Sequence, residues 1–319
     1  MKHHFGDELD RSYGHWTVTP NRERWAHHYP SLDRASDDIA TLTLTRDDKA
    51  WKRALSFGNL TELTLHNPSQ DQLAALTDFP KLAVLRITHA KPKSLTMLSE
   101  QKDLRELVLE YVSGVADLDA VGDLPTLTAL HIENMRNLSD FAALGSSASL
   151  RYLALNGTPD WKQPIASLKF LGSMTAIELL RLGNVRIPEI ANPFGSLLNS
   201  KTIRWLRLAM HILPLAEYAR LEAALPNVDG ARRPAFSKYG GIDRELSPRD
   251  IRARMPLAQF SEYTNLYVAP DGKRFERVPH QALLLGKGER HVSGAEQFVN
   301  ERCDAHQQKY DALVSDFRR

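Results

Sequence analysis

The sequence predicts an α/β solenoid, in which short parallel strands stack side by side and share one continuous core. A six-residue pattern, with aliphatic residues at its first, fourth and sixth positions, recurs eight times between residues 39 and 208. Its copies start 21 to 27 residues apart, which is the period of one strand and its return segment. Alternation within each copy predicts a strand with one buried face.

The copies agree in their aliphatic positions and differ in the residues between them. They read IATLTL from Ile39, LTELTL from Leu60, LAVLRI from Leu82, LRELVL from Leu104, LTALHI from Leu127, LRYLAL from Leu150, IELLRL from Ile177 and IRWLRL from Ile203. A degenerate ninth copy, LPNVDG, follows from Leu225. One strand cannot cover its own apolar face, so neighbouring copies must stack. The return segments supply the opposite wall of the core through Leu73, Leu76, Phe79, Phe141 and Leu144.

The repeated L-x-x-L-x-L resembles the leucine-rich-repeat family, with the irregular repeats of its bacterial members. The resemblance implies a curved parallel sheet on the concave side and helical or irregular return segments on the convex side. It covers about residues 39–231. The resemblance implies an Asn or Cys three residues after the last leucine of each strand. None of the eight copies has either residue at that position. Asparagine stands one place earlier in three copies, at Asn67, Asn134 and Asn184.

Three segments follow from this division of the chain. Residues 1–38, with Trp16, Trp25 and Tyr29, are expected to form an N-terminal cap over the exposed edge of the first repeat. Residues 39–231 form the repeats, and residues 232–319, which break the period, form a small α+β module or cap.

The C-terminal module is expected to contain a hairpin, a second strand pair and a closing helix. The hairpin turns at Asp271–Gly272, and the strand pair lies around Gly286–Gly288. The helix is expected to start at Ser293, with Glu296 completing a capping box. Its apolar residues recur at helical spacing, at Phe298, Val299, Cys303, Tyr310, Leu313, Val314 and Phe317.

Residues between the strand leucines are expected to point out of the concave sheet in three columns. The first column is Thr41, Glu62, Val84, Glu106, Ala129, Tyr152, Leu179 and Trp205. The second is Thr43, Thr64, Arg86, Val108, His131, Ala154, Arg181 and Arg207. The third is Thr45, His66, Thr88, Glu110, Glu133, Asn156, Gly183 and Ala209.

The C-terminal end of these columns is the strongest candidate for a binding site. It joins aromatic and apolar residues to two arginines, residue types that are enriched in binding hot spots: Tyr152, Leu179, Trp205, Arg181 and Arg207. In the alternative, the C-terminal segment folds back over Leu179 and Trp205 as a cap. Charged residues in the middle of the sheet are expected to set specificity through electrostatic complementarity: Arg86, Glu106, Glu110, His131 and Glu133.

Composition and motifs exclude several classes of function. A net charge of +2 gives no strong signal for a polyanionic partner, so nucleic-acid binding is not expected. No apolar run is long enough for a signal-peptide core or a membrane span, which predicts a soluble, cytoplasmic protein. No cofactor motif and no metal motif is present. The N-terminal histidines, His3, His4, His15, His27 and His28, are expected to be exposed or packed in the cap rather than metal ligands.

Two alternatives stand beside protein binding. In the first, the repeats position a substrate for a C-terminal catalytic module centred on Cys303, as in the bacterial leucine-rich-repeat ubiquitin ligases. Only 88 residues follow the array, too few for that family's catalytic domain, and Cys303 falls on the apolar stripe of the last helix. Asp304 and His306 make no catalytic set with it. The sequence therefore predicts a protein that is not an enzyme, with the C-terminal module as the one part left open.

In the second alternative, the chain is a nucleic-acid adaptor that uses Arg232–Lys238 with Arg249, Arg252 and Arg254. Lys and Arg outnumber Asp and Glu by only 16 to 12 in residues 232–319. This imbalance favours a solvated linker and helix face. The leading interpretation is a module that binds a protein partner on the concave sheet.

Overall fold

The computed structural model of this chain describes residues 25–79, 81–188, 191–249 and 266–319. It contains two compact units. The first extends to Ile212 and includes Asn227–Ala231, and the second comprises Leu213–Pro226 and Arg232–Arg319. The first unit thus holds all eight copies of the repeated pattern. The helical segment Leu213–Pro226, which follows the eighth copy, belongs to the second unit.

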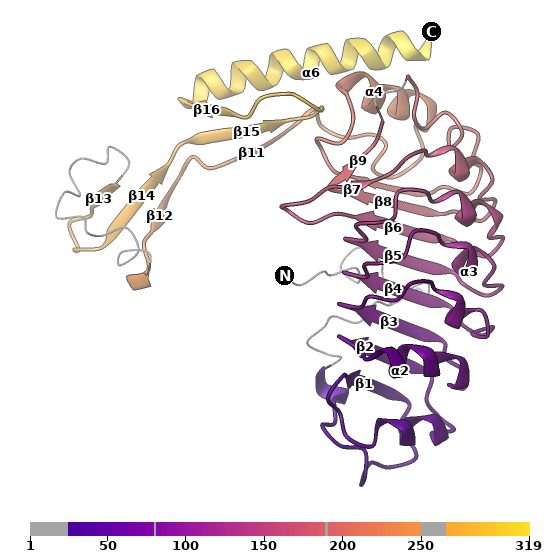
Figure 1. The fold of residues 1–319 in the computed structure, drawn as a ribbon. Coiled ribbons are helices and arrows are strands. Elements are labelled where there is room, and N and C mark those ends of the chain that lie inside the picture. Colours follow the sequence, from indigo (N-terminus) through magenta and orange to yellow (C-terminus); the bar gives the residue numbers. More distant parts are fainter. Residues whose placement is uncertain (1–24, 80, 189–190, 250–265) are drawn as a thin grey trace. The chain divides into compact units, whose positions relative to one another are not determined.

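The first unit is built on one parallel sheet, in which every copy of the repeated pattern gives one strand (Figure 1). The strands run in chain order: β1 (Thr41–Thr45), β2 (Glu62–His66), β3 (Val84–Thr88), β4 (Glu106–Glu110), β5 (Ala129–Glu133), β6 (Tyr152–Asn156), β8 (Leu179–Gly183) and β10 (Trp205–Leu208). The sheet confirms the predicted leucine-rich-repeat solenoid.

The strand register brings equivalent positions of neighbouring repeats together. Thr41 pairs with Glu62, and Trp205 pairs with Leu179 at the far end. The predicted columns are therefore real rows on the sheet, although the third ends before Ala209 because β10 stops at Leu208. The ninth copy contributes an isolated bridge between Asp229 and Trp205 rather than a full strand.

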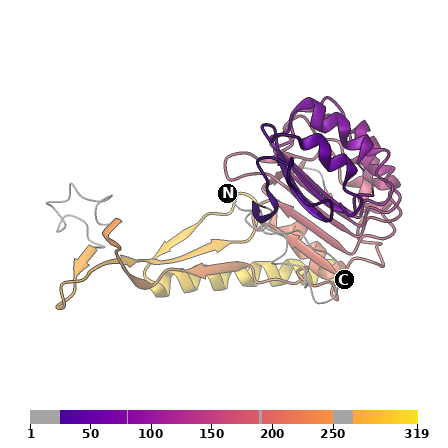
Figure 2. The same cartoon turned by 90° about the horizontal axis from the view of Figure 1, so that it is seen from below.

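Short helical return segments cover the other face of the sheet (Figures 1 and 2). They are η3 (Trp51–Ser56), α2 (Gln70–Ala74), η4 (Ala75–Asp78), η5 (Thr96–Leu98), α3 (Asp119–Gly122), η6 (Ala142–Ser146) and η7 (Lys169–Gly172). The strand leucines meet the return segments in a closed core, and the predicted wall residues are buried: Leu73, Leu76, Phe79, Phe141 and Leu144. A two-residue parallel pair, β7 (Gln163–Pro164) and β9 (Val185–Arg186), extends two of the returns.

A left-handed residue follows directly after most of these strands. The φ angles at this position are 47° for Asn67, 55° for His89, 55° for Tyr111, 54° for Asn134 and 50° for Asn184. Asparagine tolerates this conformation better than other non-glycine residues. Asn67, Asn134 and Asn184 stand one place earlier than the asparagine of the family pattern because they adopt the left-handed conformation that turns the chain out of the strand.

Buried glutamines supply the backbone hydrogen bonds that an inward asparagine would otherwise make. Gln72 donates to the carbonyl of Thr45 at 2.7 Å, and Gln101 donates to that of Leu76 at 2.5 Å. Gln163 donates to the carbonyl of Leu138 at 2.7 Å and accepts from a backbone N–H. These three side chains are at most 3% exposed and reach from one repeat to the preceding one. These hydrogen bonds link neighbouring repeats at three places along the array.

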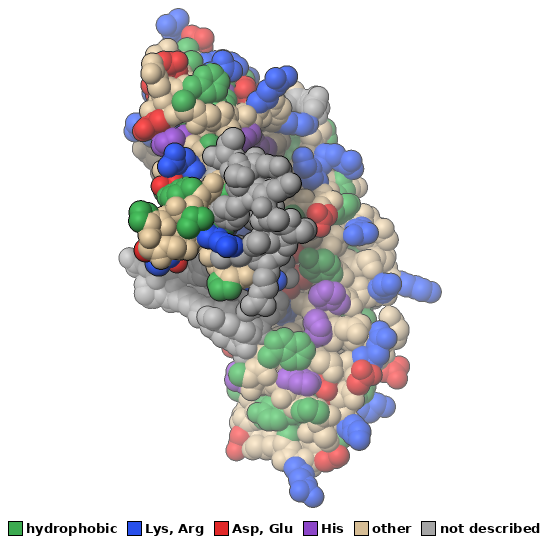
Figure 3. All heavy atoms as spheres, turned by 90° about the vertical axis from the view of Figure 1, so that its left-hand side faces the viewer, with side chains coloured by type: hydrophobic (Ala, Val, Ile, Leu, Met, Phe, Trp, Pro, Cys, Tyr) green, Lys and Arg blue, Asp and Glu red, His purple; other side chains and the backbone are tan. Residues whose placement is uncertain are grey.

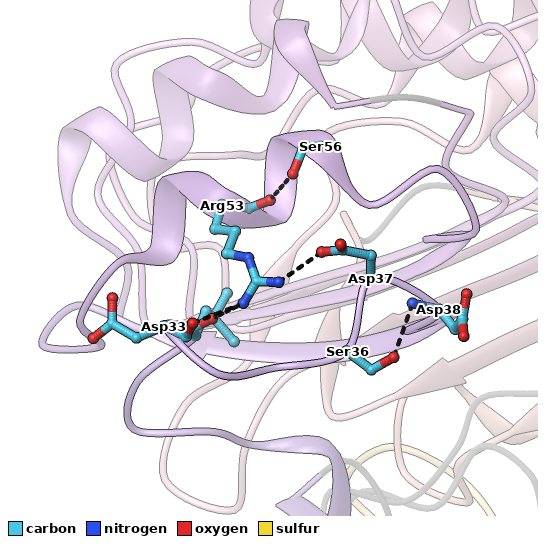
Figure 4. A network of polar contacts seen from close by, with 7 residues as sticks. Asp33, Ser36, Asp37, Asp38, Arg53 and Ser56 are labelled. Atoms are coloured by element: carbon cyan, nitrogen blue, oxygen red, sulfur yellow. Dashed lines mark hydrogen bonds and ion pairs between the residues drawn. The ribbon is translucent and has the colours of Figure 1, made fainter.

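Arg53 in η3 anchors the segment that precedes the first repeat (Figure 4). Its guanidinium donates to the carbonyls of Leu32 and Asp33 at 2.7 and 3.0 Å, and to the Asp37 carboxylate at 2.8 Å. The Arg53 carbonyl in turn accepts a hydrogen bond from the Ser56 hydroxyl. Leu32 is fully buried, as expected for a residue that covers the open edge of a terminal repeat.

The described residues of the second unit form two antiparallel three-stranded sheets and two longer helices. One sheet has the order β11 (Phe236–Tyr239), β15 (His280–Leu284), β16 (Val292–Gly294), and the other β12 (Ile242–Glu245), β14 (Arg274–Val278), β13 (Leu266–Val268). The predicted turn at Asp271–Gly272 joins β13 and β14, and Gly272 has a φ of 80°. The second predicted strand pair is β15 with β16.

The helices of the second unit pack on each other and on one sheet. Helix α6 (Glu296–Arg318) covers the β11–β15–β16 sheet and also contacts α4 (Leu215–Ala224). Val299 and Cys303 of α6 are buried against Ala282, Leu284 and Val292. Farther along α6, the Tyr310 hydroxyl donates to the Glu222 carboxylate of α4 at 2.9 Å.

The predicted start of the closing helix is wrong. Helix α6 begins at Glu296 with Ala295 as its N-cap residue, and no side chain caps it. Ser293 cannot serve as the cap because it belongs to β16 and pairs with Gln281. The apolar stripe also differs at one position, since Phe298 is 49% exposed whereas His306 is buried. His306 satisfies its ring by a hydrogen bond to the carbonyl of Leu285 at 2.8 Å.

Within the described ranges, none of the helices combines the length and the apolar composition that a membrane span requires. The predicted cap residue Trp16 and the histidines His3, His4 and His15 lie outside the described residues, as do Arg252 and Arg254.

Candidate functional site

The structure places all the predicted contact residues on one face of the sheet, but most of them are buried. Tyr152 and Leu179 have no exposed surface. Four charged or ionisable side chains of the predicted site are also buried, with at most 4% of their surface exposed: Arg86, Glu110, His131 and Glu133. These side chains project from the predicted face of the sheet and are covered there. Alternation fixes the face from which a side chain projects, whereas its burial depends on what packs there.

An apolar cluster occupies the C-terminal part of the concave face. It comprises Val108, Ala129, Tyr152, Ala154 and Leu179, and Trp205 packs against it. Alanines at two of these positions leave room for the Tyr152 ring between neighbouring strands. Burial raises the pKa of the Tyr152 phenol, opposed by the nearby Arg151 guanidinium. This cluster gives Trp205 a rigid support while leaving its ring partly exposed.

A charged cluster lies on strands β3, β4 and β5. Arg86 donates to the Glu110 carboxylate at 2.5 Å. The His131 Nε2 atom is 3.9 Å from the other Glu110 oxygen and 4.0 Å from the Glu133 carboxylate. Two carboxylates thus meet one guanidinium and one imidazole, and all four side chains are buried. Ion pairs in such surroundings are costly to break, because the remaining charge is left desolvated.

The accessible part of the predicted site is the last strand pair with its arginines. Arg181, Trp205 and Arg207 are all partly exposed, as is Glu106 farther along the first column. Arg207 donates to the Asp229 carboxylate at 2.7 Å, which fixes its guanidinium against the ninth copy. The turn after Asp229 requires Gly230, whose φ is 80° and where a Cβ would lie 2.0 Å from the Leu206 carbonyl oxygen.

A second surface feature lies where the first strands end. We name it the imidazole-aromatic strip and define it as Trp25, His28, His66, His89 and Tyr111. Trp25 is 43% exposed, His89 is exposed, and the other three are partly exposed. Figure 3 views this edge, and histidine and hydrophobic side chains adjoin one another in the lower half of the molecule.

The rings of the strip contact one another in sequence. The centroid of Trp25 lies 5.2 Å from those of both His28 and His66, with the rings edge to face. His66 and His89 are 5.1 Å apart, and His89 stacks on Tyr111 at 4.8 Å with an interplanar angle of 5°. Rings that pack on one another in this way cover their faces and present N–H and O–H edges to solvent.

Local backbone geometry explains why these rings gather. His89 and Tyr111 occupy the left-handed position after β3 and β4, where the turn directs the side chain away from the core. His66 ends β2 and accepts or donates a hydrogen bond with the Thr88 hydroxyl at 2.8 Å. Sequence reasoning missed this strip. Its signal was the alignment of His89 and Tyr111 with Asn67 and Asn134, which marks the left-handed position after the strand.

Burial shifts the pKa values at both ends of the strip, and neighbouring charged groups add to these shifts. Burial lowers the pKa of His66, and the neighbouring His89, Arg86 and His28 lower it further, against the opposing effect of Glu110. At the other end, burial raises the pKa of Tyr111, and the carboxylates of Glu133, Glu110 and Asp160 raise it further.

Among the described residues, no group of three or more His, Cys, Asp or Glu side chains is arranged to hold a metal ion. His28 is instead paired with the Asp48 carboxylate at 3.0 Å, and His306 with a backbone carbonyl.

We expect Cys303 to be inert toward a disulfide-exchange thiol probe in the folded protein and to react fully once the chain is unfolded. The thiol has no exposed surface, and burial raises its pKa, so both access and the thiolate form are lacking. The measurement compares the rate of probe release in buffer and in guanidinium. Rapid native reaction would support the catalytic alternative, in which Cys303 must reach a substrate.

No protein-family model matches the sequence, and no curated protein matches it either. Solved structures similar to this chain include an internalin of Listeria monocytogenes, at 24% identity and a TM-score of 0.39, over 57% of this chain and 52% of the internalin. The leucine-rich repeat domain of the type III effector XopL matches at 18% identity and a TM-score of 0.38, over 56% of this chain and 64% of that domain.

A leucine-rich-repeat protein of Leptospira interrogans matches at 15% identity and a TM-score of 0.33, over 67% of this chain and 64% of that protein. This chain thus spans about half to two thirds of the length of these three. The similarity is remote. The eight aligned repeats and their parallel sheet show by themselves that the chain has the leucine-rich-repeat fold.

Proposed function

We propose that this chain is a protein-interaction module, and that its partner binds the concave face at the last strands of the sheet. The observation that carries the proposal is the partly exposed ring of Trp205, which packs on a buried apolar cluster beside Arg181 and Arg207. A large ring held on a rigid base loses little entropy when it is covered by a partner. Tryptophan and arginine also dominate measured binding hot spots.

The fixed guanidinium of Arg207 supports the same proposal. Its bond to Asp229 leaves the side chain 29% exposed and restricts its rotamers before any partner arrives. Pre-organised arginines favour carboxylates and backbone carbonyls as partners because they present several N–H groups in one plane. Tyr152 and Leu179 contribute by supporting Trp205, and the charged cluster of Arg86, Glu110, His131 and Glu133 contributes by fixing the middle of the sheet.

The test is affinity capture from cells of the source with the Arg181→Ala/Trp205→Ala variant. We expect the variant to retain less than about a tenth of the partner that the unmodified chain captures, since two hot-spot residues together contribute several kcal/mol. Tyr152 is left unchanged, because its removal would open a cavity in the sheet.

A matched control is the Lys102→Ala/Lys169→Ala variant, which removes two exposed side chains on the return segments. It should capture as much partner as the unmodified chain, and both variants should melt within a few degrees of it. Equal capture by the Arg181→Ala/Trp205→Ala variant would show that the partner does not bind at the last strands.

A further inference from the structure

We propose that residues 11–24 of this chain lie across its own concave face, over strands β3 to β6, and cover the charged and aromatic side chains there. The proposal concerns the middle of the sheet. It involves none of the three side chains proposed to contact the partner, which are Arg181, Trp205 and Arg207. Either proposal can therefore be right or wrong without the other.

The side chains on this part of the face are buried as far as their tips. Tyr152 pairs with Ala129 and Leu179, which have shorter side chains, yet its phenol oxygen is buried. Both carboxylate oxygens of Glu133 and both ring nitrogens of His131 are buried as well. Side chains stand roughly perpendicular to a sheet, so neighbours flank a side chain without covering its tip. Atoms from outside the sheet must therefore lie over this face.

The described parts of the first unit do not supply this cover. Their return segments lie on the opposite face of the sheet (Figures 1 and 2). The described elements that pack closely against β4, β5 and β6 are other strands of the same sheet. The burial arises within a single chain, so the cover comes from residues of that chain outside the described ranges.

Residues 11–24 are long enough and close enough in sequence to reach this face. They lead directly into Trp25, whose ring contacts His66 at the end of β2. The strand spacing of about 4.8 Å puts β6 roughly 19 Å from β2, whereas this segment spans up to about 45 Å when extended. Residues 250–265 also lie outside the described ranges, but they belong to the second unit.

Charge complementarity favours the same segment. The face of β2 to β5 carries four glutamates and one arginine: Glu62, Glu106, Glu110, Glu133 and Arg86. Because Arg86 pairs with Glu110, the acidic excess lies at the other three positions. Residues 11–24 carry three arginines and one glutamate, whereas residues 1–10 carry three carboxylates and one lysine. Opposite charges across a contact select the basic segment over the acidic one.

The aromatic residues of the segment match the apolar part of the face. Val108, Ala129 and Tyr152 belong to the buried apolar cluster described above. Residues 11–24 contain two aromatic rings, Tyr13 and Trp16, that can cover this cluster. Aromatic rings bury a large apolar area and keep one polar group for a hydrogen bond, which suits a face that mixes apolar and charged side chains.

Photo-crosslinking of the full chain tests the contact. Benzoylphenylalanine in place of Trp16 should crosslink within the chain to residues of β4, β5 or β6, located by tandem mass spectrometry. Benzoylphenylalanine in place of Lys52, an exposed residue of a return segment, should not crosslink to these strands. Crosslinks from position 16 only to the second unit, to the return segments or to a second copy of the chain would overturn the proposal.

Nitration of Tyr152 by tetranitromethane measures the cover independently. The phenol should react slowly in the unmodified chain, because it is buried and its pKa is raised. We expect Tyr13→Ser/Trp16→Ser to raise the nitration rate at least about tenfold, since two anchoring rings are lost. Tyr310 of the second unit is the internal standard, because its phenol is buried against Glu222 and should react slowly in both chains.

The matched control is Phe5→Ser/Leu9→Ser, which removes two apolar side chains from residues 1–10. It should leave the nitration rate of Tyr152 unchanged, and an increase equal to that in Tyr13→Ser/Trp16→Ser would refute the assignment to residues 11–24. An unchanged rate in Tyr13→Ser/Trp16→Ser would show that these residues do not cover the face. Fast nitration of Tyr152 in the unmodified chain would show that the face is open, which also contradicts the proposal.

Discussion

Replacement of Arg86 by leucine is expected to lower the free energy of unfolding by about 3–5 kcal/mol. Arg86 is 1% exposed and donates to Glu110, which is 4% exposed. Without the guanidinium, the Glu110 carboxylate remains buried beside Glu133 and His131 with its closest cation removed. Urea titration followed by circular dichroism measures the loss.

A double-mutant cycle distinguishes the ion pair from simple loss of volume. The Arg86→Leu/Glu110→Leu variant should be more stable than Arg86→Leu alone, because the second change removes the uncompensated charge. The partly exposed pair of Lys309 and Glu289 is the control, and Lys309→Leu should cost less than about 1 kcal/mol. If Arg86→Leu were no more harmful than Lys309→Leu, the buried cluster would not stabilise the sheet.

The repeats made the sheet predictable from sequence. Aliphatic alternation predicted each strand, and the recurrence of the same six-residue pattern placed equivalent residues side by side, as in the pairing of Thr41 with Glu62 and of Arg86 with Val108. Register follows because a shift by one residue would turn every strand leucine to the wrong face. The same logic places Glu110 beside Glu133 on neighbouring strands, as the structure shows.

Burial on the concave face could not be predicted in the same way. Tyr152 and Trp205 occupy the same column, yet the first is fully buried and the second is partly exposed. The pattern of a strand states only which way a side chain points. The imidazole-aromatic strip was missed for a related reason, since Trp25 and His66 lie far apart in the sequence and meet only through tertiary packing.

The glutamines that link the repeats were also invisible to pattern analysis. Gln72, Gln101 and Gln163 stand at different distances from the starts of their repeats, so no alignment of the copies brings them together. A single polar residue in an irregular return segment is ordinarily exposed. Only the structure shows that each reaches back to a carbonyl of the preceding repeat.

Gln163 makes the most complete of these links, and we expect Gln163→Leu to lower the free energy of unfolding by about 3 kcal/mol. The side chain is fully buried, accepts from the Met135 N–H at 2.9 Å and donates to the carbonyls of Leu138 and Met135 at 2.7 and 3.2 Å. Leucine fills the same space but leaves the N–H and a carbonyl without these partners. Each buried group left unsatisfied costs about 1–3 kcal/mol.

Two further variants test the direction of these hydrogen bonds. Gln101 donates only to carbonyls, which keep a second lone pair, so Gln101→Leu should cost less than Gln163→Leu in the same urea titration. Gln163→Glu retains an acceptor for the Met135 N–H but sets a carboxylate oxygen against the Leu138 carbonyl, and should be at least as harmful as leucine. Equal stability of Gln163→Leu and the unmodified chain would mean that the leucine core alone holds neighbouring repeats in place.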